Sequence, residues 1–303
     1  MTLNRFGRDY ELFLQIDDDN AIKIAPPIRI AFDGVKSIDR KLNELNIQIY
    51  NLNREHRNKI VRDAKDKDPQ KDKDKTKKTQ AEKDADKAAE KKDPSAVYRI
   101  VFRCGYDHLE TLFTGDILTA YTERSGADFI THVTGQDGLF DFRSAFTSKT
   151  VKGDPIDAIL SDMKRTKKGK ITKQRKDSIR PRVLVGNSAK LISEQIFDED
   201  VMFFDDGTLH VLKDGEVVSD IAVNINSETG LLQAPTKSDK FISAQTLMNP
   251  AVRIGGLVNI ESIYAPHYNG VYRVETIKFS GDFDGTDWKM ELLLKAGNYE
   301  VVK

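Results

Sequence analysis

The sequence predicts a mainly β protein in which two β-rich regions flank a smaller α/β middle region. Apolar and polar residues alternate along most of the first 134 residues and again along the last ninety, which is typical of half-buried strands. Apolar residues at helical spacing occur mostly in the middle. A length of 303 residues is enough for about two domains. With 39% hydrophobic and 32% charged residues, the composition excludes a wholly disordered chain.

The N-terminal region is predicted to consist of short antiparallel strands. In one of them, Ile28, Ile30 and Phe32 share a face at period two. Gly105–Tyr106 and Thr114–Asp116 are interpreted as hairpin turns, and a short helix is expected over 53–63. The expected strands are 10–16, 21–25, 28–32, 46–50, 96–104, 110–114, 116–121 and 127–133.

A charged insert interrupts this region at residues 64–94. It contains 11 lysines and 9 acidic residues, and alanine is its only apolar residue type. Without an apolar stripe, a helix there cannot be stabilised by packing. The insert is therefore predicted to be a projecting, flexible excursion from the first β region, partly helical at most.

The middle region is predicted to contain two helices and a hairpin. The first helix spans 154–163, with Pro155 in its first turn and apolar residues at helical spacing. The second spans 188–196. Asp-Gly pairs on both sides of 208–212 predict a β-hairpin there.

Strands return near the C-terminus, at 256–263, 270–279 and 288–294. They are separated by Asn-Gly and Asp-Gly turn signals, and Trp288 is expected to be a large core contact. The chain has five Asp-Gly pairs, which we interpret as turn signals rather than as active-site carboxylates. Their aspartates are Asp33, Asp137, Asp206, Asp214 and Asp284.

A net charge of zero conceals one strongly basic segment. Residues 164–182 carry ten lysines or arginines against one acid, a local charge of +9, so the chain outside this segment and the insert carries −11. The segment could neutralise phosphates, although it has no aromatic residue for stacking on bases. A flexible basic loop that contacts an acidic neighbouring subunit is the other interpretation. The candidate interaction residues are Lys164, Arg165, Lys167, Lys168, Lys170, Lys173, Arg175 and Lys176.

No motif in the sequence indicates catalysis. The five histidines are scattered, and no two of them have the i, i+3 or i+4 spacing of a helical metal site. Cys104 is expected to be a buried structural residue, and a single cysteine excludes an internal disulfide. We therefore expect no enzyme activity and no catalytic, cofactor or metal site. No apolar run approaches the length of a membrane span, and a reducing, cytoplasm-like compartment is expected.

The C-terminal third resembles the baseplate hub proteins of tailed phages, a tail-tube-like family related to the hub part of type VI secretion spike proteins. The order of the motifs carries the resemblance, and residues 135–138, 150–160 and the strands near Arg5 to Phe32 match the same family. The C-terminal motifs are Thr229–Pro235 (TGLLQAP), Leu247–Pro250 (LMNP), Ile254–Ser262 (IGGLVNIES), Asn269–Asp282 (NGVYRVETIKFSGD) and Trp288.

The resemblance implies a structural virion protein that forms a homotrimer. Each subunit would contribute two tail-tube-like β-barrel domains, at 1–134 and 216–303, with 135–215 as the middle α/β region. The trimer would join a hexameric tail tube to a trimeric central spike and form part of the DNA conduit. Other baseplate proteins and the tape measure protein are further expected partners. The alternatives are a nucleic-acid-binding protein that uses 164–182 and, with less support, a tail-borne peptidoglycan hydrolase, for which no carboxylate pair or metal site is found.

Overall fold

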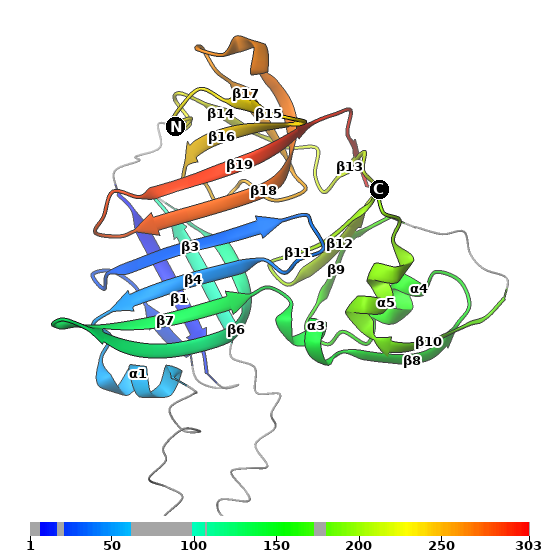
Figure 1. Ribbon diagram of the computed structural model, residues 1–303, viewed down its shortest axis with the longest axis horizontal. Coiled ribbons are helices and arrows are strands. Elements are labelled where there is room, and N and C mark those ends of the chain that lie inside the picture. Colours follow the sequence, from blue (N-terminus) through cyan, green and yellow to red (C-terminus); the bar gives the residue numbers. More distant parts are fainter. Residues whose placement is uncertain (1–6, 17–20, 62–98, 107, 173–179, 303) are drawn as a thin grey trace, which may run out of the picture.

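One sheet of 13 strands contains strands from both β-rich regions (Figure 1). The computed structural model describes residues 7–16, 21–61, 99–106, 108–172 and 180–302. The main path of the sheet has the strand order β15-β16-β19-β18-β3-β4-β7-β6-β5-β1-β2; in addition, β17 pairs with β18, and β14 pairs with β17. The charged insert 64–94 lies outside the described residues. No described helix is long and apolar enough to cross a membrane.

The N-terminal strands follow the predicted alternation, with small shifts at their ends. Burial alternates along β1 and β4, where every second residue is buried, but not along the long strand β6. These strands are β1 (Asp9–Gln15), β2 (Ala21–Ile24), β3 (Ile30–Ser37), β4 (Glu44–Tyr50), β5 (Arg99–Gly105), β6 (Leu109–Ser125) and β7 (Asp128–Gln136). Helix α1 (Arg54–Ile60) begins at Asn53, whose side chain accepts a hydrogen bond from the backbone N–H of His56.

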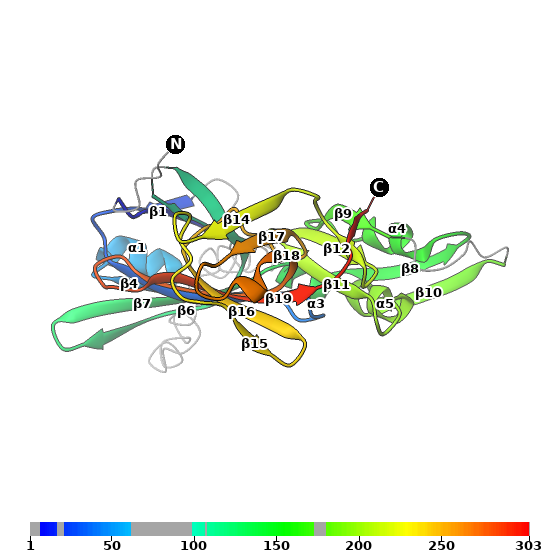
Figure 2. The ribbon, with the colours of Figure 1, turned by 90° about the horizontal axis from the view of Figure 1, so that it is seen from above.

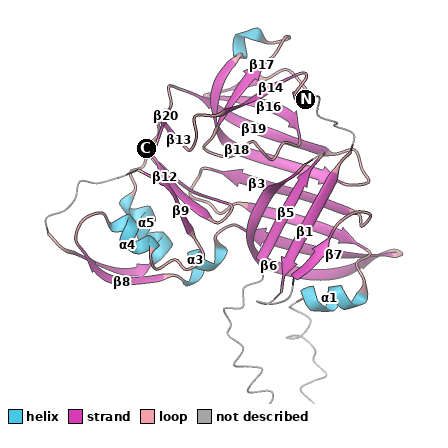
Figure 3. Cartoon of the chain, turned by 180° about the vertical axis from the view of Figure 1, so that it is seen from behind, coloured by secondary structure: helices cyan, strands magenta, loops and turns pink. Residues whose placement is uncertain are grey.

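The predicted hairpin turn at Thr114–Asp116 is wrong. These residues lie inside β6, which pairs with β5 along its first half and with β7 along its second half. A Cβ on Gly115 would lie 2.7 Å from the carbonyl oxygen of Gln136, so this glycine allows two strands to approach closely. The sheet curls over at β6, and Figure 3 shows β1 and β5 lying across β3 and β4.

The middle region has a separate core beside the large sheet (Figure 2). The two predicted helices and the hairpin are confirmed as α4, α5 and the β11–β12 pair, although α4 ends at Leu160. A two-stranded sheet, β8–β10, and a three-stranded sheet, β11-β12-β9, make up its strands. The elements are α3 (Leu139–Ser144), β8 (Phe146–Val151), α4 (Pro155–Leu160), β9 (Lys167–Ile171), β10 (Arg182–Asn187), α5 (Ser188–Gln195), β11 (Val201–Asp205) and β12 (Thr208–Leu212).

The three predicted C-terminal strands are confirmed as β17, β18 and β19. The C-terminal elements are β13 (Glu216–Val217), β14 (Ala222–Asn226), β15 (Thr236–Ser238), β16 (Phe241–Leu247), β17 (Leu257–Glu261), the 3₁₀ turn η2 (Pro266–Tyr268), β18 (Gly270–Asp282), β19 (Trp288–Ala296) and β20 (Glu300–Val301). Trp288 is 2% exposed, which confirms it as a core residue.

The antiparallel pairing of β3 with β18 joins the two β-rich regions, and we call this pairing the seam. Two glycines face two phenylalanines across it: Gly34 is opposite Phe279, and Gly281 is opposite Phe32. A Cβ on Gly34 would lie 2.3 Å from the Phe279 ring, and a Cβ on Gly281 would lie 2.4 Å from the Phe32 ring. From the sequence alone, the Asp33–Gly34 pair is interpreted as a turn signal. That interpretation is wrong, because Gly34 provides room for an aromatic ring inside a strand.

The aromatic side chains at the seam connect the two halves of the core. The Phe32 ring lies 4.7 Å from the Phe102 ring of β5 and 5.2 Å from the Trp288 ring of β19, both edge-on. Edge-to-face pairs at such distances are favourable beyond the area that they bury. The main apolar core therefore runs through the seam without interruption.

We predict that Gly34→Val destabilises the fold by about 3 kcal/mol, because the new side chain overlaps the Phe279 ring in a packed core. Urea unfolding followed by tryptophan fluorescence measures this, since Trp288 contacts Phe32 of the same cluster. Gly7→Val is the matched control, because nothing lies within 4 Å of a Cβ built at Gly7. Equal stability of the two variants would show that the seam tolerates a side chain.

Candidate functional site

The described part of the basic segment begins with a fixed turn and continues as a strand. The expectation of a flexible loop is wrong for Lys167–Ile171, which form β9 and pair with β12 in parallel. Lys164 and Arg165 lie between α4 and β9. Lys173, Arg175 and Lys176 lie outside the described residues. Thus five of the eight predicted interaction residues can be placed.

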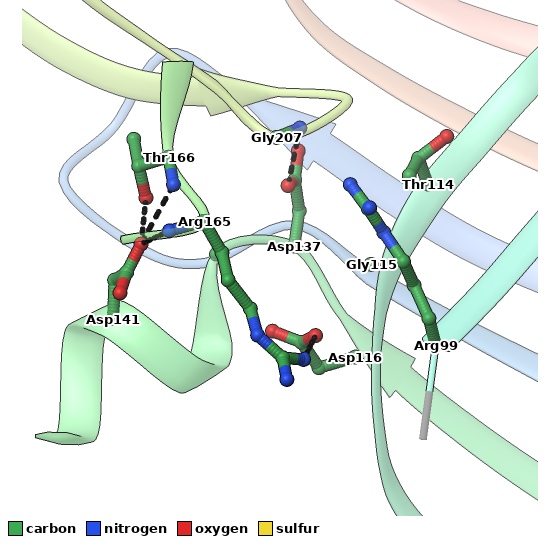
Figure 4. Close-up of a pocket in the computed structure, with 10 residues that line it drawn as sticks. Arg99, Thr114, Gly115, Asp116, Asp137, Asp141, Arg165, Thr166 and Gly207 are labelled. Atoms are coloured by element: carbon green, nitrogen blue, oxygen red, sulfur yellow. Dashed lines mark hydrogen bonds and ion pairs between the residues drawn. The ribbon is translucent and has the colours of Figure 1, made fainter. Parts of the chain in front are cut away.

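A buried carboxylate holds the start of the segment. Asp141 of α3 accepts hydrogen bonds from the backbone N–H groups of Lys164, Arg165 and Thr166, at 3.1, 2.8 and 2.7 Å. The hydroxyl of Thr166 donates a further bond at 2.8 Å (Figure 4). The Asp141 carboxylate is 2% exposed and accepts from four donors. These hydrogen bonds fix the position of the first residues of the basic segment, which follow α4.

Several of the basic side chains have partners within the chain. The Arg165 guanidinium lies 3.7 Å from Asp116 (Figure 4). It also stacks over Phe140, 4.3 Å from the ring centre. Lys168 forms an ion pair with Asp157 at 2.6 Å, and Lys170 donates to the carbonyl of Val302 at 3.0 Å. Lys164 and Lys167 have exposed side chains. Internal partners thus reduce the positive charge that this segment offers to phosphates.

A second polar cluster lies where the middle region meets both parts of the large sheet; we call it the junction cluster. Lys36 of β3, 2% exposed, lies 2.8 Å from Asp205, the last residue of β11, and 3.0 Å from Asp206 in the β11–β12 turn. Arg253, which precedes β17, forms an ion pair with Asp206 and donates to the carbonyl of Thr111 in β6 at 3.0 Å. Asp206 also accepts from the backbone N–H of Thr114 at 2.9 Å. These charges connect three regions of the chain.

In the junction cluster, the Lys36 amine and the Asp205 carboxyl group are kept in their charged forms by neighbouring groups of opposite charge. Burial disfavours the charge on Lys36, but Asp205 and Asp206 outweigh it and raise the pKa of the amine. Burial also disfavours ionised Asp205, yet Lys36 and Arg253 lower the pKa of this carboxyl. A buried ion pair that loses one partner leaves an uncompensated charge, which is costly.

The junction cluster is not among the sites predicted from the sequence. Asp206 was interpreted only as a turn residue, and that interpretation is confirmed by the hairpin. The available signal was Lys36 itself, because Ile30, Phe32, Gly34 and Lys36 follow one another at period two on the inward face of β3. A lysine on an apolar face requires a buried acidic partner.

Asp137 lies next to the junction cluster and adds a third carboxyl group to those of Asp205 and Asp206. One of its oxygens accepts from the backbone N–H of Gly207 at 2.8 Å, and the other has no hydrogen-bond partner (Figure 4). Burial, together with the nearby Asp206 and Asp205, raises the pKa of Asp137 to about 8. Since Lys36 and Arg253 already balance the other two carboxylates, Asp137 is mostly protonated at neutral pH.

We predict that Asp137→Asn removes a pH dependence of stability. The pKa of Asp137 in the folded state lies above its ordinary value of 3.8. Protonation of Asp137 therefore stabilises the folded state. This stabilisation is fully present below pH 3.8 and is lost as the pH rises through about 8. The free energy of unfolding of the wild type should therefore fall relative to that of the variant across this range. Urea titrations at several pH values measure the difference, with exposed Asp198→Asn as the control. Parallel curves for wild type and Asp137→Asn would contradict the assignment.

The remaining titratable candidates have structural surroundings. Cys104 is fully buried, as predicted, and burial raises the pKa of its thiol. Burial lowers the pKa of His210, whose ring accepts from the backbone N–H of Lys170 at 3.1 Å and stacks on Phe203. Among the described residues, no three His, Cys, Asp or Glu side chains are grouped so that they could hold a metal ion.

Comparison with solved structures shows that the fold is that of phage tail proteins. A 43 kDa tail protein of prophage MuSo2 from Shewanella oneidensis matches with a TM-score of 0.57 and 8% identity, over 94% of this chain and 96% of that chain. A tail protein from Neisseria meningitidis MC58 matches with a TM-score of 0.57 and 10% identity, over 96% and 97%. The E. coli c3393 protein, described as a type VI secretion component similar to T4 tail proteins gp27 and gp5, has a TM-score of 0.56 and 9% identity, over 91% and 76%.

A family model identifies the chain more closely. The model described as baseplate hub gp41 matches residues 11–282, which is nearly the whole chain. The protein therefore belongs to the baseplate hub gp41 family, and the resemblance seen in the C-terminal motifs is confirmed. Membership implies a structural role in the baseplate of a phage tail, together with other tail components. A search of curated protein sequences gave no match.

Proposed function

We propose that three copies of this chain form a ring that joins the hexameric tail tube to the trimeric central spike. The observation that carries the proposal is the seam, which holds two β-rich regions of one chain in a single sheet. On each side of the seam the sheet continues for at least four strands. Two tail-tube-like units per subunit, at 1–134 and 216–303, would give a trimer six such units. A trimer could then match sixfold symmetry on one side and threefold symmetry on the other.

We further propose that the solvent-facing side of the seam strands lines the DNA conduit. Several of its side chains on β3, β4 and β7 are polar and bonded to one another, although Val35 of β3 is also exposed on this side. Asn46 donates to Asp33 at 3.2 Å, Thr134 to Asn46 at 3.0 Å, and Gln136 to Glu44 at 3.1 Å. On β18 and β19, Lys278 is paired in register with Glu291. A wall of mixed charge suits passing DNA, because a basic wall would hold it by releasing counterions.

The proposed role requires no catalysed reaction and no cofactor. The tail tube protein, the central spike protein and other baseplate proteins would be direct partners, and the tape measure protein could contact the ring. Assembly would take place in the host cytoplasm, and the product would be part of the virion tail without a membrane anchor. The middle region, 135–215, would lie outside the channel with its basic segment towards a neighbouring subunit.

We predict that the chain, mixed with its tail tube protein, assembles in multiples of three. Native mass spectrometry of the mixture and of the chain alone measures the number of copies. Monomers in the isolated sample are compatible with assembly on the tube. A stable dimer in either sample would contradict the ring, because two copies cannot supply six tube-like units.

We also predict that the chain binds DNA no more tightly than a non-specific DNA-binding protein does, with a Kd of about 10⁻⁶ M or weaker at physiological salt. Fluorescence anisotropy with duplex and single-stranded DNA over a salt series measures this. The matched variant replaces Lys164, Lys167 and Lys168 by serine and should behave like the wild type. Tight, salt-sensitive binding that this variant loses would favour the nucleic-acid-binding function instead.

A further inference from the structure

The two most exposed large apolar side chains among the described residues are neighbours. Ile263 is 79% exposed and Tyr264 is 89% exposed, in the loop between β17 and β18. This loop contains η2 and forms the orange projection at the top of Figure 1. The pair adds exposed apolar surface to this projection, and tyrosine is one of the residue types enriched at the energetic centres of interfaces. We call this pair the apolar tip.

The backbone on both sides of the apolar tip is fixed. Ser262 and Ala265 are 4% and 5% exposed, and the Ala265 N–H donates to the Ser262 hydroxyl at 3.2 Å. The Ser262 N–H donates to the side chain of Asn269 at 2.7 Å, which closes the loop. The tip is therefore held out in one conformation before it meets a partner, and this lowers the entropy cost of binding.

A groove of about 410 Å³ lies on a different part of the molecule, in the middle region. Ala189 of α5 and Met202 of β11, both almost fully buried, lie at its base. Its remaining lining residues are Arg40, Phe142, Asn187, Lys190 and Ser193. Asn187 connects α3 with α5 at the groove. Its side chain donates to the carbonyl of Phe142 at 2.9 Å and accepts from the N–H of Lys190 at 3.0 Å.

The tip and the groove are complementary in chemistry. The groove has an apolar base and two cations, Arg40 and Lys190, with no acid among its lining residues. The tip is apolar and directly follows the exposed carboxylate of Glu261, which the side chain of Asn259 holds at 3.0 Å. The groove is large enough for an aromatic side chain, and the carboxylate could then lie near the two cations. Opposite charges around an apolar anchor favour one orientation of docking.

We propose that Ile263 and Tyr264 of one copy insert into this groove of the next copy, with Glu261 towards Arg40 and Lys190. The inference rests on the proposed ring. Tip and groove are separate surfaces, so the contact is heterologous: each copy offers its tip to one neighbour and its groove to the other. A heterologous contact that closes after three copies gives a ring of that symmetry.

Disulfide trapping tests the contact in the full chain, in the presence of the tail tube protein. The variant carries Tyr264→Cys and Ser193→Cys; the native Cys104 is fully buried and does not compete. Oxidation should give covalent dimers and trimers on a non-reducing gel, with no larger species. The matched control carries Ile221→Cys, a site 76% exposed, with Ser193→Cys, and should not be trapped as a trimer.

The oligomeric state of the unmodified chain separates this inference from the proposed function. Trimers of the unmodified chain without trapping in the double variant would overturn the tip–groove contact and leave the ring standing. Covalent species larger than trimers would also overturn the tip–groove contact, because the contact would then not close into a ring of three copies. Failure of the unmodified chain to form trimers even in the presence of the tail tube protein would end both proposals. A charge exchange gives independent support: Glu261→Lys should weaken assembly at least tenfold, and adding Lys190→Glu should restore part of it.

Discussion

The reciprocal packing of two glycines against two phenylalanines across the seam is the constraint on which the rest of the structure depends. Strands β3 and β18 are far apart in the sequence, and they can pair closely because Gly34 and Gly281 leave space for Phe279 and Phe32. Phe32 then contacts aromatic rings from both halves of the chain. A single core results, and the two β-rich regions cannot move as separate bodies without breaking it.

The junction cluster attaches the middle region to this frame. Lys36 is on β3, two residues beyond Gly34 and therefore on the same inward face, so the seam also places the buried cation. Asp205 and Asp206, at the end of β11 and in the turn that follows it, form ion pairs with Lys36. Arg253, from the C-terminal part of the chain, pairs with Asp206, so that two cations face two carboxylates. Balanced charges in a buried place are costly to rearrange, which favours one fixed orientation of the middle region.

Much of the fold could be predicted from the sequence, because alternation and turn residues are local signals. The strands at 10–16, 46–50 and 288–294 follow from period two alone. Pairing is not local, however: nothing near Gly34 in the sequence indicates that an aromatic ring from residue 279 fills the space beside it. For this reason the local sequence at Gly34 predicts a turn.

The candidate site was less predictable for the same reason. The basic segment is visible as a run of charge, but its acidic partners, Asp116, Asp141 and Asp157, come from other elements. A carboxylate in an Asp-Gly pair has the same sequence signal whether it only makes a turn, as at residue 284, or also joins a buried ion cluster, as at residue 206. Only the position of Lys36 on an apolar face indicated that an acid had to be buried nearby.

The central claim is that the seam allows one chain to supply two tube-like units to a threefold ring. Cryo-electron microscopy of the assembled tail, reconstructed at the layer between tube and spike, tests it most directly. The account predicts three copies of this chain, with the polar side chains of β3 and β4 facing the channel and six sheet units in the ring. Six copies, or a sheet that faces away from the channel, would contradict it.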